Sequence, residues 1–244
     1  MKSARDVRLT RRRYYKPEAG HSQTVTVPPP FDLVIFDCDG VLVDSETISA
    51  TTLADNLIRI GFPVDLNYVN ENYLGRSFDV IRADYVRRAG RPLPQEFAAA
   101  WYRDLFAAFR RDLKPIAGVA DVLQRLAIPK CVASSSAPAR LALSLEVSGL
   151  ACLCGADVFD ASMVNRGKPA PDLFLYCAER MGAVPTRTLV VEDSTSGIAA
   201  AVAAGMTAWA FVGGSHYAPG TDTAPLRRAG AARIFASMIE FGLE

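Results

Sequence analysis

The sequence predicts an α/β protein with a doubly wound parallel sheet and a small helical domain inserted after the first strand. Short apolar runs alternate with segments whose apolar residues recur at three- and four-residue spacing, which is typical of a parallel sheet covered by helices. The runs expected as strands are 33–37, 130–134, 188–192 and 207–212. We therefore expect a Rossmann-like core formed by residues 31–45 and 115–244, with residues 46–114 inserted as a separate cap.

The insert at 46–114 has a helical pattern throughout and is too long for a loop. Its apolar positions form stripes at helical spacing, among them Phe97, Trp101, Leu105 and Phe109. We interpret the aromatic residues as the core of the cap rather than as a ligand cradle. The insert begins right after the first strand, so we expect it to stand over the edge of the sheet where open α/β sheets bind ligands.

Composition favours a globular enzyme. The chain has 244 residues, of which 50% are apolar, and these supply ample material for a core. No apolar run approaches the ~18 residues of a membrane helix, and the N-terminus is charged, so we expect a cytoplasmic protein with no membrane partner. The five cysteines are an odd number, which favours reduced thiols; we interpret Cys152 and Cys154 as small core residues.

Positive charge is concentrated at the N-terminus. Residues 1–20 carry seven Lys or Arg residues against Asp6 and Glu18, and a proline triplet follows at 28–30. The segment lacks an apolar face of useful length, so we interpret residues 1–30 as a disordered basic tail. We do not expect a nucleic-acid partner.

An acidic motif follows the first predicted strand. Asp37 and Asp39 are two residues apart, and in extended chain such residues point to the same side, so they are expected to face one site. Two close carboxylates are unfavourable unless a cation compensates them or one keeps its proton. Both outcomes suit phosphate ester chemistry with Mg²⁺. Taken alone, the motif is also compatible with an acidic turn between a strand and a helix.

Three later motifs supply complementary chemistry. Ser134 ends the second run, and its hydroxyl and the following Ser135 N–H group suit phosphate oxygens. Lys168 precedes two prolines that mark a helix start, so its ammonium is expected on a rigid loop where it neutralises carboxylate and phosphate. Glu192 and Asp193 end the third run, at the carboxyl edge of the sheet, where Mg²⁺ finds oxygen ligands.

In this order, the four motifs resemble those of the haloacid dehalogenase superfamily of phosphohydrolases, over about residues 31–240. The helical insert resembles the cap of the subgroup that contains β-phosphoglucomutase and many small sugar phosphatases. Asp39 argues against dehalogenation, because the true dehalogenases of this superfamily lack an acid two residues after the nucleophile. The resemblance therefore implies phosphate chemistry on the Rossmann-like fold.

The resemblance implies a two-step reaction. Asp37 attacks phosphorus, Asp39 protonates the departing alcohol, and water activated by Asp39 then hydrolyses the aspartyl phosphate. Mg²⁺ and the side chains of Ser134 and Lys168 are expected to stabilise the phosphoryl oxygens. The expected metal ligands are Asp37, Asp39, Glu192 and Asp193. Whether Glu192 or Asp193 is the principal second ligand is left open.

The expected partner is a small phosphate ester, and the chain is expected to be a monomer or a weak homodimer. Gly75-Arg76-Ser77 resembles the specificity loop of the subgroup, so Gly75, Arg76 and Ser135 are expected to bind substrate. The substrate is predicted to be a phosphorylated metabolite such as a sugar or sugar-acid phosphate.

Two alternatives remain. A phosphosugar mutase is the first, but its branch carries a cap histidine near the position of Ser49, whereas this chain has only His21 and His216. A non-catalytic phosphate-binding protein is the second, and the intact motif set argues against it.

Overall fold

A parallel sheet forms the centre of the structure, a computed structural model that describes residues 31–73, 75 and 78–243. Within these residues the sheet has six strands in the order β3-β2-β1-β4-β5-β6, all parallel. The strands are β1 Leu33–Phe36, β2 Lys130–Ser134, β3 Val158–Asp160, β4 Thr188–Glu192, β5 Thr207–Phe211 and β6 Arg233–Phe235. Because β1 is central, its carboxyl end lies between those of β2 and β4.

Helices cover both faces of the sheet, because side chains alternate along each strand. On β1, Val34 and Phe36 join one apolar cluster while Leu33 and Ile35 join another. The first cluster includes residues of α5–α7 and the second includes residues of α8–α10. The core helices are α5 Val119–Arg125, α6 Pro138–Val147, α7 Ala151–Cys154, α8 Asp172–Met181, α9 Thr195–Ala203 and α10 Ala224–Ala229. The predicted doubly wound fold is confirmed.

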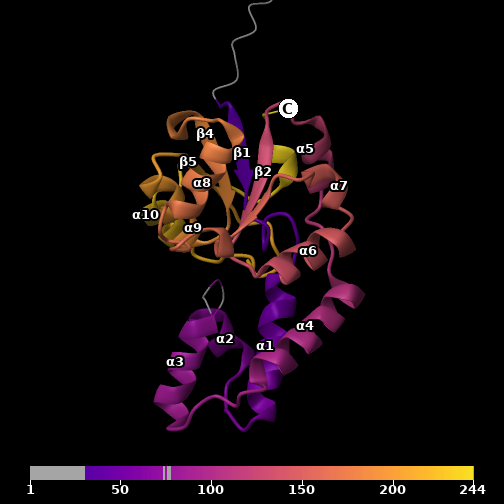
Figure 1. Cartoon of the computed structure of the whole chain (residues 1–244), viewed down its shortest axis with the longest axis vertical. Coiled ribbons are helices and arrows are strands. Elements are labelled where there is room, and N and C mark those ends of the chain that lie inside the picture. Colours follow the sequence, from indigo (N-terminus) through magenta and orange to yellow (C-terminus); the bar gives the residue numbers. More distant parts are fainter. Residues whose placement is uncertain (1–30, 74, 76–77, 244) are drawn as a thin grey trace, which may run out of the picture.

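The insert after β1 is helical, as predicted, and forms the lower lobe in Figure 1. Its helices are α1 Glu46–Arg59, α2 Leu66–Asn72, α3 Phe78–Ala89 and α4 Phe97–Asp112. Phe97, Leu105 and Phe109 of α4 are buried, because this face of the amphipathic helix packs against α1. We refer to α1–α4 as the cap and to the rest as the core.

One cysteine and the two short strands β3 and β6 differ from what the sequence predicts. Cys152 is exposed, whereas the other four cysteines are buried; it lies on the outer side of the one-turn helix α7, and only Cys154 of that pair is a core residue. All five are free thiols. Strands β3 and β6 were not predicted, since each has only three residues. The predicted tail at 1–30 and Arg76 lie outside the described residues.

None of the described helices combines the length and the apolar character needed to span a membrane.

Candidate active site

Asp37 and Lys168 form a buried ion pair at the carboxyl end of β1. Asp37 directly follows β1, and its N–H donates to the carbonyl of Val191 at 2.9 Å, which extends the ladder with β4 by one residue. The Lys168 ammonium donates to Asp37 Oδ1 at 2.5 Å, to Glu192 Oε1 at 2.7 Å and to the Ala133 carbonyl at 2.9 Å. Burial opposes ionisation of the ammonium, but the two carboxylates outweigh it, so the pKa of Lys168 is raised. Lys168 therefore stays charged.

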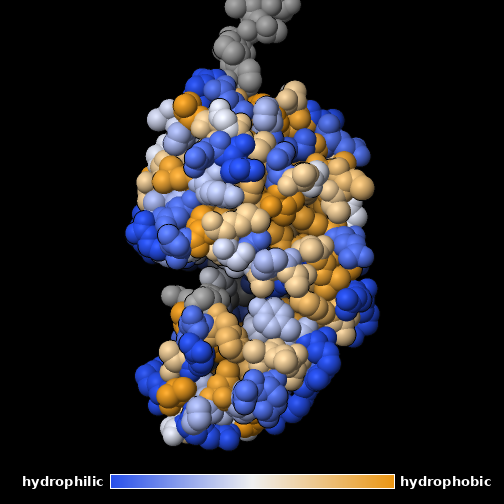
Figure 2. Space-filling model, viewed as in Figure 1, coloured by the Kyte–Doolittle hydropathy of each residue, from blue (hydrophilic) through white to orange (hydrophobic). Residues whose placement is uncertain are grey.

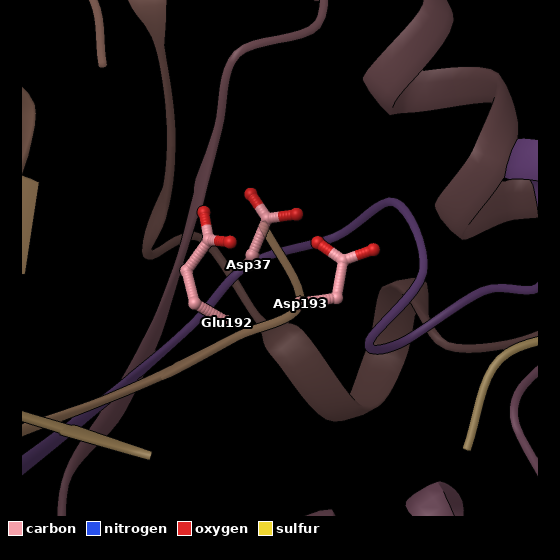
Figure 3. Close-up of side chains that lie close together, drawn as sticks. All are labelled: Asp37, Glu192 and Asp193. Atoms are coloured by element: carbon pink, nitrogen blue, oxygen red, sulfur yellow. The ribbon is translucent and has the colours of Figure 1, made fainter. Parts of the chain in front are cut away.

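Three buried carboxylates gather around this ion pair (Figure 3). Each of Asp37, Glu192 and Asp193 offers one oxygen, and these oxygens lie within 4.8 Å of one another. Burial raises the pKa of Asp37 and of Asp193 well above ordinary values, and repulsion from Glu192 adds to both shifts. A divalent cation among the three would offset this repulsion. Hard, buried carboxylate oxygens are the donors that Mg²⁺ prefers, so the residues fit the predicted ion.

Two glycines make room for the cluster. Gly40 has φ +75°, and a Cβ atom at this position would lie 1.9 Å from Asp193 Oδ2. Gly197, in the first turn of α9, is similar: its Cβ would lie 1.8 Å from Glu192 Oε1. Any side chain at either position would collide with a carboxylate of the cluster. The other oxygen of Glu192 accepts hydrogen bonds from the N–H and the hydroxyl of Ser194, both at 2.8 Å.

Asp39 is held separately from the cluster. Its Oδ1 accepts from the Ser45 hydroxyl at 2.5 Å and from Arg140 Nη2 at 2.8 Å, and its Oδ2 accepts from the Ser136 hydroxyl at 2.6 Å. Burial opposes ionisation of Asp39, but Arg140 and the two hydroxyls outweigh it and hold the pKa of this carboxyl below its ordinary value. The structure thus brings Asp39 to the same cavity as Asp37, but not into the group of carboxylates that offers a metal site.

The serine triplet lies at the end of β2. Ser134 is buried, and its Oγ accepts a hydrogen bond from the N–H of Ser136 at 3.0 Å. Ser135 and Ser136 both line the cavity, whereas Ser134 is not among the lining residues. Of the residues predicted to bind substrate, Ser135 and Gly75 are therefore at the cavity wall. Arg76 lies outside the described residues.

The cavity opens between core and cap and has a volume of about 390 Å³. In Figure 2 the same region appears as a notch between the two lobes. The core contributes the charged floor, while the cap contributes mostly apolar side chains. Phe78, Trp101 and Tyr102 are aromatic members of that wall, and the rings of Phe78 and Trp101 stack with centroids 5.9 Å apart. We interpreted Trp101 as cap core; it is buried, but it also faces the cavity.

Three residues near the site were missed from the sequence. Arg140 lies in the first turn of α6, six positions after Ser134. A cation there opposes the helix dipole, and this is a signal that a nearby anion compensates it. Glu46 begins α1 and lines the cavity; burial and the nearby Asp39 raise its pKa to about 7. His216 lies far along the chain, yet its Nε2 is 3.1 Å from Asp193 Oδ2. No local sequence pattern around His216 predicts its contact with Asp193.

The buried ion pair gives a stability prediction. We expect Lys168→Met to lower the free energy of unfolding by about 3–5 kcal/mol, because Asp37 and Glu192 would lose the cation that compensates them. Urea denaturation of the metal-free protein measures this. Arg166→Met is the matched control: its arginine side chain is 70% exposed and pairs with Asp172, so we expect a loss of about 1 kcal/mol or less. Equal losses in the two variants would contradict the prediction.

Fold and site together define a capped, doubly wound α/β enzyme with an acidic centre at the carboxyl edge of its sheet. The chain belongs to the haloacid dehalogenase-like hydrolase family, whose model matches residues 31–205. The family resemblance seen in the sequence is thereby confirmed.

Solved structures and curated relatives agree with this assignment. A haloacid dehalogenase-like protein of unknown function from Agrobacterium tumefaciens is 37% identical, with a TM-score of 0.76 over 86% of this chain and 96% of the other. A family hydrolase from Deinococcus radiodurans, solved with bound phosphate and sodium, is also 37% identical, with a TM-score of 0.71 over 87% of this chain and 94% of the other. The 6-phosphogluconate phosphatase of Escherichia coli is 26% identical over 77% of this chain and 86% of its own length.

Proposed function

We propose that this hydrolase is a phosphatase that releases phosphate from a small phosphorylated metabolite through an aspartyl phosphate on Asp37. The observation that carries the proposal is the Asp37 carboxylate at the floor of the cavity, held by Lys168 beside two further carboxylates. A nucleophile of this kind needs positive charge around it to accept a phosphate group that is itself anionic. The phosphate found in the Deinococcus radiodurans relative supports the same ligand chemistry.

In the first step, an Asp37 oxygen attacks phosphorus and the ester oxygen departs with a proton from Asp39, which takes up that proton when the anionic phosphate binds beside it and offsets the charge of Arg140. In the second step, Asp39 takes a proton from water, the water oxygen attacks phosphorus, and the bond to Asp37 breaks. Lys168 compensates charge on Asp37 throughout, and the Ser134 hydroxyl and Ser135 N–H are assigned to the phosphoryl oxygens. Asp39 returns to its starting protonation state.

We assign the metal site to Asp37 and Asp193 as the principal side-chain ligands. Both oxygens of Glu192 already accept hydrogen bonds, from Lys168 and from Ser194, so Glu192 is assigned to orient Lys168 and the site. The Asp39 side chain, bonded to Arg140 and two hydroxyls, is assigned to proton transfer rather than to the ion. Bound there, Mg²⁺ supplies positive charge that stabilises the phosphoryl oxygens.

For the substrate we propose a sugar or sugar-acid phosphate. The volume of the cavity suits a small metabolite, and the aromatic wall formed by Phe78, Trp101 and Tyr102 suits the flat apolar face of a sugar ring. The phosphatase activity named for the Escherichia coli relative concerns a compound of this class. A panel of phosphorylated metabolites, assayed for phosphate release with Mg²⁺, tests the proposal. Phosphate release from none of them by the folded, Mg²⁺-supplied protein would contradict it.

The specificity loop gives a further prediction. Gly75 lines the cavity, so the neighbouring Arg76 is expected to contact a charged or hydroxylated part of the substrate remote from phosphorus. We expect Arg76→Ala to lower kcat/KM for the best substrate of the panel by about ten- to a hundredfold, or ~1.4–2.7 kcal/mol. The matched measurement uses 4-nitrophenyl phosphate, which lacks that remote part and should show a much smaller loss. Equal losses for both esters would assign Arg76 to another role.

A further inference from the structure

Arg140 is a buried cation whose role the proposed reaction leaves unassigned. It belongs to the core helix α6, and its side chain is only 13% exposed. One nitrogen, Nη2, donates both to Asp39 Oδ1 at 2.8 Å and to the Ser49 hydroxyl at 3.0 Å. Its Nε is buried without a hydrogen-bond partner among the described residues. Arg140 thus joins the predicted proton-transfer residue of the core to the first turn of the cap helix α1.

Burial of the Arg140 guanidinium would be costly without the carboxylate of Asp39 as its partner. A guanidinium in the first turn of a helix opposes the helix dipole, and a buried charge loses its hydration. The guanidinium also stands 5.4 Å from the centroid of the Phe109 ring of α4, so the cap closes one side of it. Asp39 is the one carboxylate to which the structure gives it an ion pair. We therefore regard the Arg140–Asp39 pair as a fixed unit of the site.

We propose that Arg140 is a positioning residue that holds the Asp39 carboxylate in place for the second half of the reaction, in which water attacks the aspartyl phosphate. The inference rests on the proposed function and adds a step-specific role to it. An arginine keeps its charge and does not exchange protons at the pH of the reaction, so Asp39 is the only proton carrier of the pair.

The role of Arg140 falls in the second half of the reaction. There the aspartyl phosphate meets water: Asp39 accepts a proton from water, the water oxygen bonds to phosphorus, and the phosphorus–oxygen bond to Asp37 breaks with its electron pair left on the Asp37 carboxylate. A carboxylate that swings away from phosphorus cannot take that proton. Arg140 fixes one Asp39 oxygen and the Ser136 hydroxyl fixes the other, so the carboxylate has little freedom to leave.

Ser49 of the cap takes part in the same arrangement. In the mutase branch of the subgroup that this sequence resembles, a cap histidine near this position helps to position the acid. Here the Ser49 hydroxyl accepts a hydrogen bond from Arg140 and donates one to the Ser45 carbonyl at 2.8 Å. A histidine that can gain and lose a proton is thus replaced by an arginine that reaches across from the core. The Asp39 carboxylate is thereby held by a side chain whose charge does not change with pH.

Arg140→Met tests the inference in the full-length, Mg²⁺-supplied enzyme. With 4-nitrophenyl phosphate, whose leaving group needs no proton, the first step should proceed while the second slows. We expect a burst of 4-nitrophenolate close to one per active site, followed by a steady rate at least tenfold below wild type. Intact-mass measurement after acid quench should show the phosphorylated protein. In wild type we expect neither a burst nor detectable phosphoprotein. A slowed Arg140→Met enzyme with no burst and no phosphoprotein would overturn the assignment.

Further variants separate this role from a structural one. Arg140→Lys keeps the charge and should restore part of the steady rate and reduce the burst; an enzyme as slow as Arg140→Met would contradict the charge-holding role. If Arg140→Met does not fold, Arg140→Lys alone decides: a slowed enzyme with a burst and phosphoprotein supports the assignment, and a slowed enzyme with neither overturns it. Arg103→Met, which removes an exposed arginine of the cap, should behave as wild type. Absence of phosphate release from wild type would instead contradict the proposed function, with no bearing on Arg140.

Discussion

Asp37→Asn is expected to abolish turnover while leaving the fold intact. The amide is no nucleophile, yet it has the shape of the carboxylate and keeps the backbone bond to Val191. Lys168 retains Glu192 as an ion-pair partner, so the variant does not bury an isolated charge. We expect kcat to fall by at least about 10⁴-fold, on the order of the losses seen when a nucleophile is removed from other enzymes.

Phosphate release and far-UV circular dichroism are measured on the same preparation of Asp37→Asn. Asp112→Asn is the matched control, since it makes the same exchange on an exposed carboxylate of the cap that pairs with Arg111. This control should retain wild-type activity. A folded, Mg²⁺-supplied Asp37→Asn protein that releases phosphate at the wild-type rate would rule out Asp37 as the nucleophile.

Removal of Mg²⁺ is expected to have the second largest effect. Without a cation, Asp37 and Asp193 repel each other and the incoming phosphate, and burial intensifies the repulsion. A bound divalent ion contributes several kcal/mol of charge stabilisation, so we expect activity in excess chelator to fall by about 10³-fold or more, ~4 kcal/mol of barrier. Added Mg²⁺ should restore it.

Asp193→Asn gives an independent measurement of the same site. Isothermal titration with Mg²⁺ should show weaker binding than in wild type, because one of the assigned charged ligands becomes neutral. The His216 contact at 3.1 Å involves Oδ2 of Asp193, so His216→Ala serves as a comparison that leaves all three carboxylates in place. Unchanged activity of the wild-type enzyme in excess chelator would contradict the metal requirement.

Local patterns were enough to predict the central sheet and the cap. The apolar runs of β1, β2 and β4 end in polar motifs, and parallel order brings these ends to one edge. Lys168 comes from the loop before α8, but the predicted convergence of Asp37, Ser134 and Asp193 rests on this strand order. Their convergence follows from the fold alone, because carboxyl ends of neighbouring parallel strands must lie side by side.

The rest depended on contacts between distant segments. The only local signal for Arg140 is its place in the first turn of α6, and its partners lie in distant segments, the loop after β1 and the start of α1. His216 lies in the loop after β5, where nothing in sequence order points to Asp193. Glu46 was predicted only as the first residue of the cap, and its burial beside Asp39, which raises its pKa, depends on the folded structure. Strands β3 and β6 are too short for alternation to be recognised, and they form as edges of an existing sheet.

The central place of β1 has a consequence for synthesis on the ribosome. Asp37 leaves the ribosome early, but its partner Lys168 lies 131 residues later, and Glu192 and Asp193 come later still. At ~5–20 residues per second, Lys168 is synthesised on the order of 7–26 s after Asp37. During that interval β1 has β2 on one side and an open edge on the other, which is the kind of edge that pairs with other chains. Emergence of β4 closes that edge and completes the acidic centre in a single event.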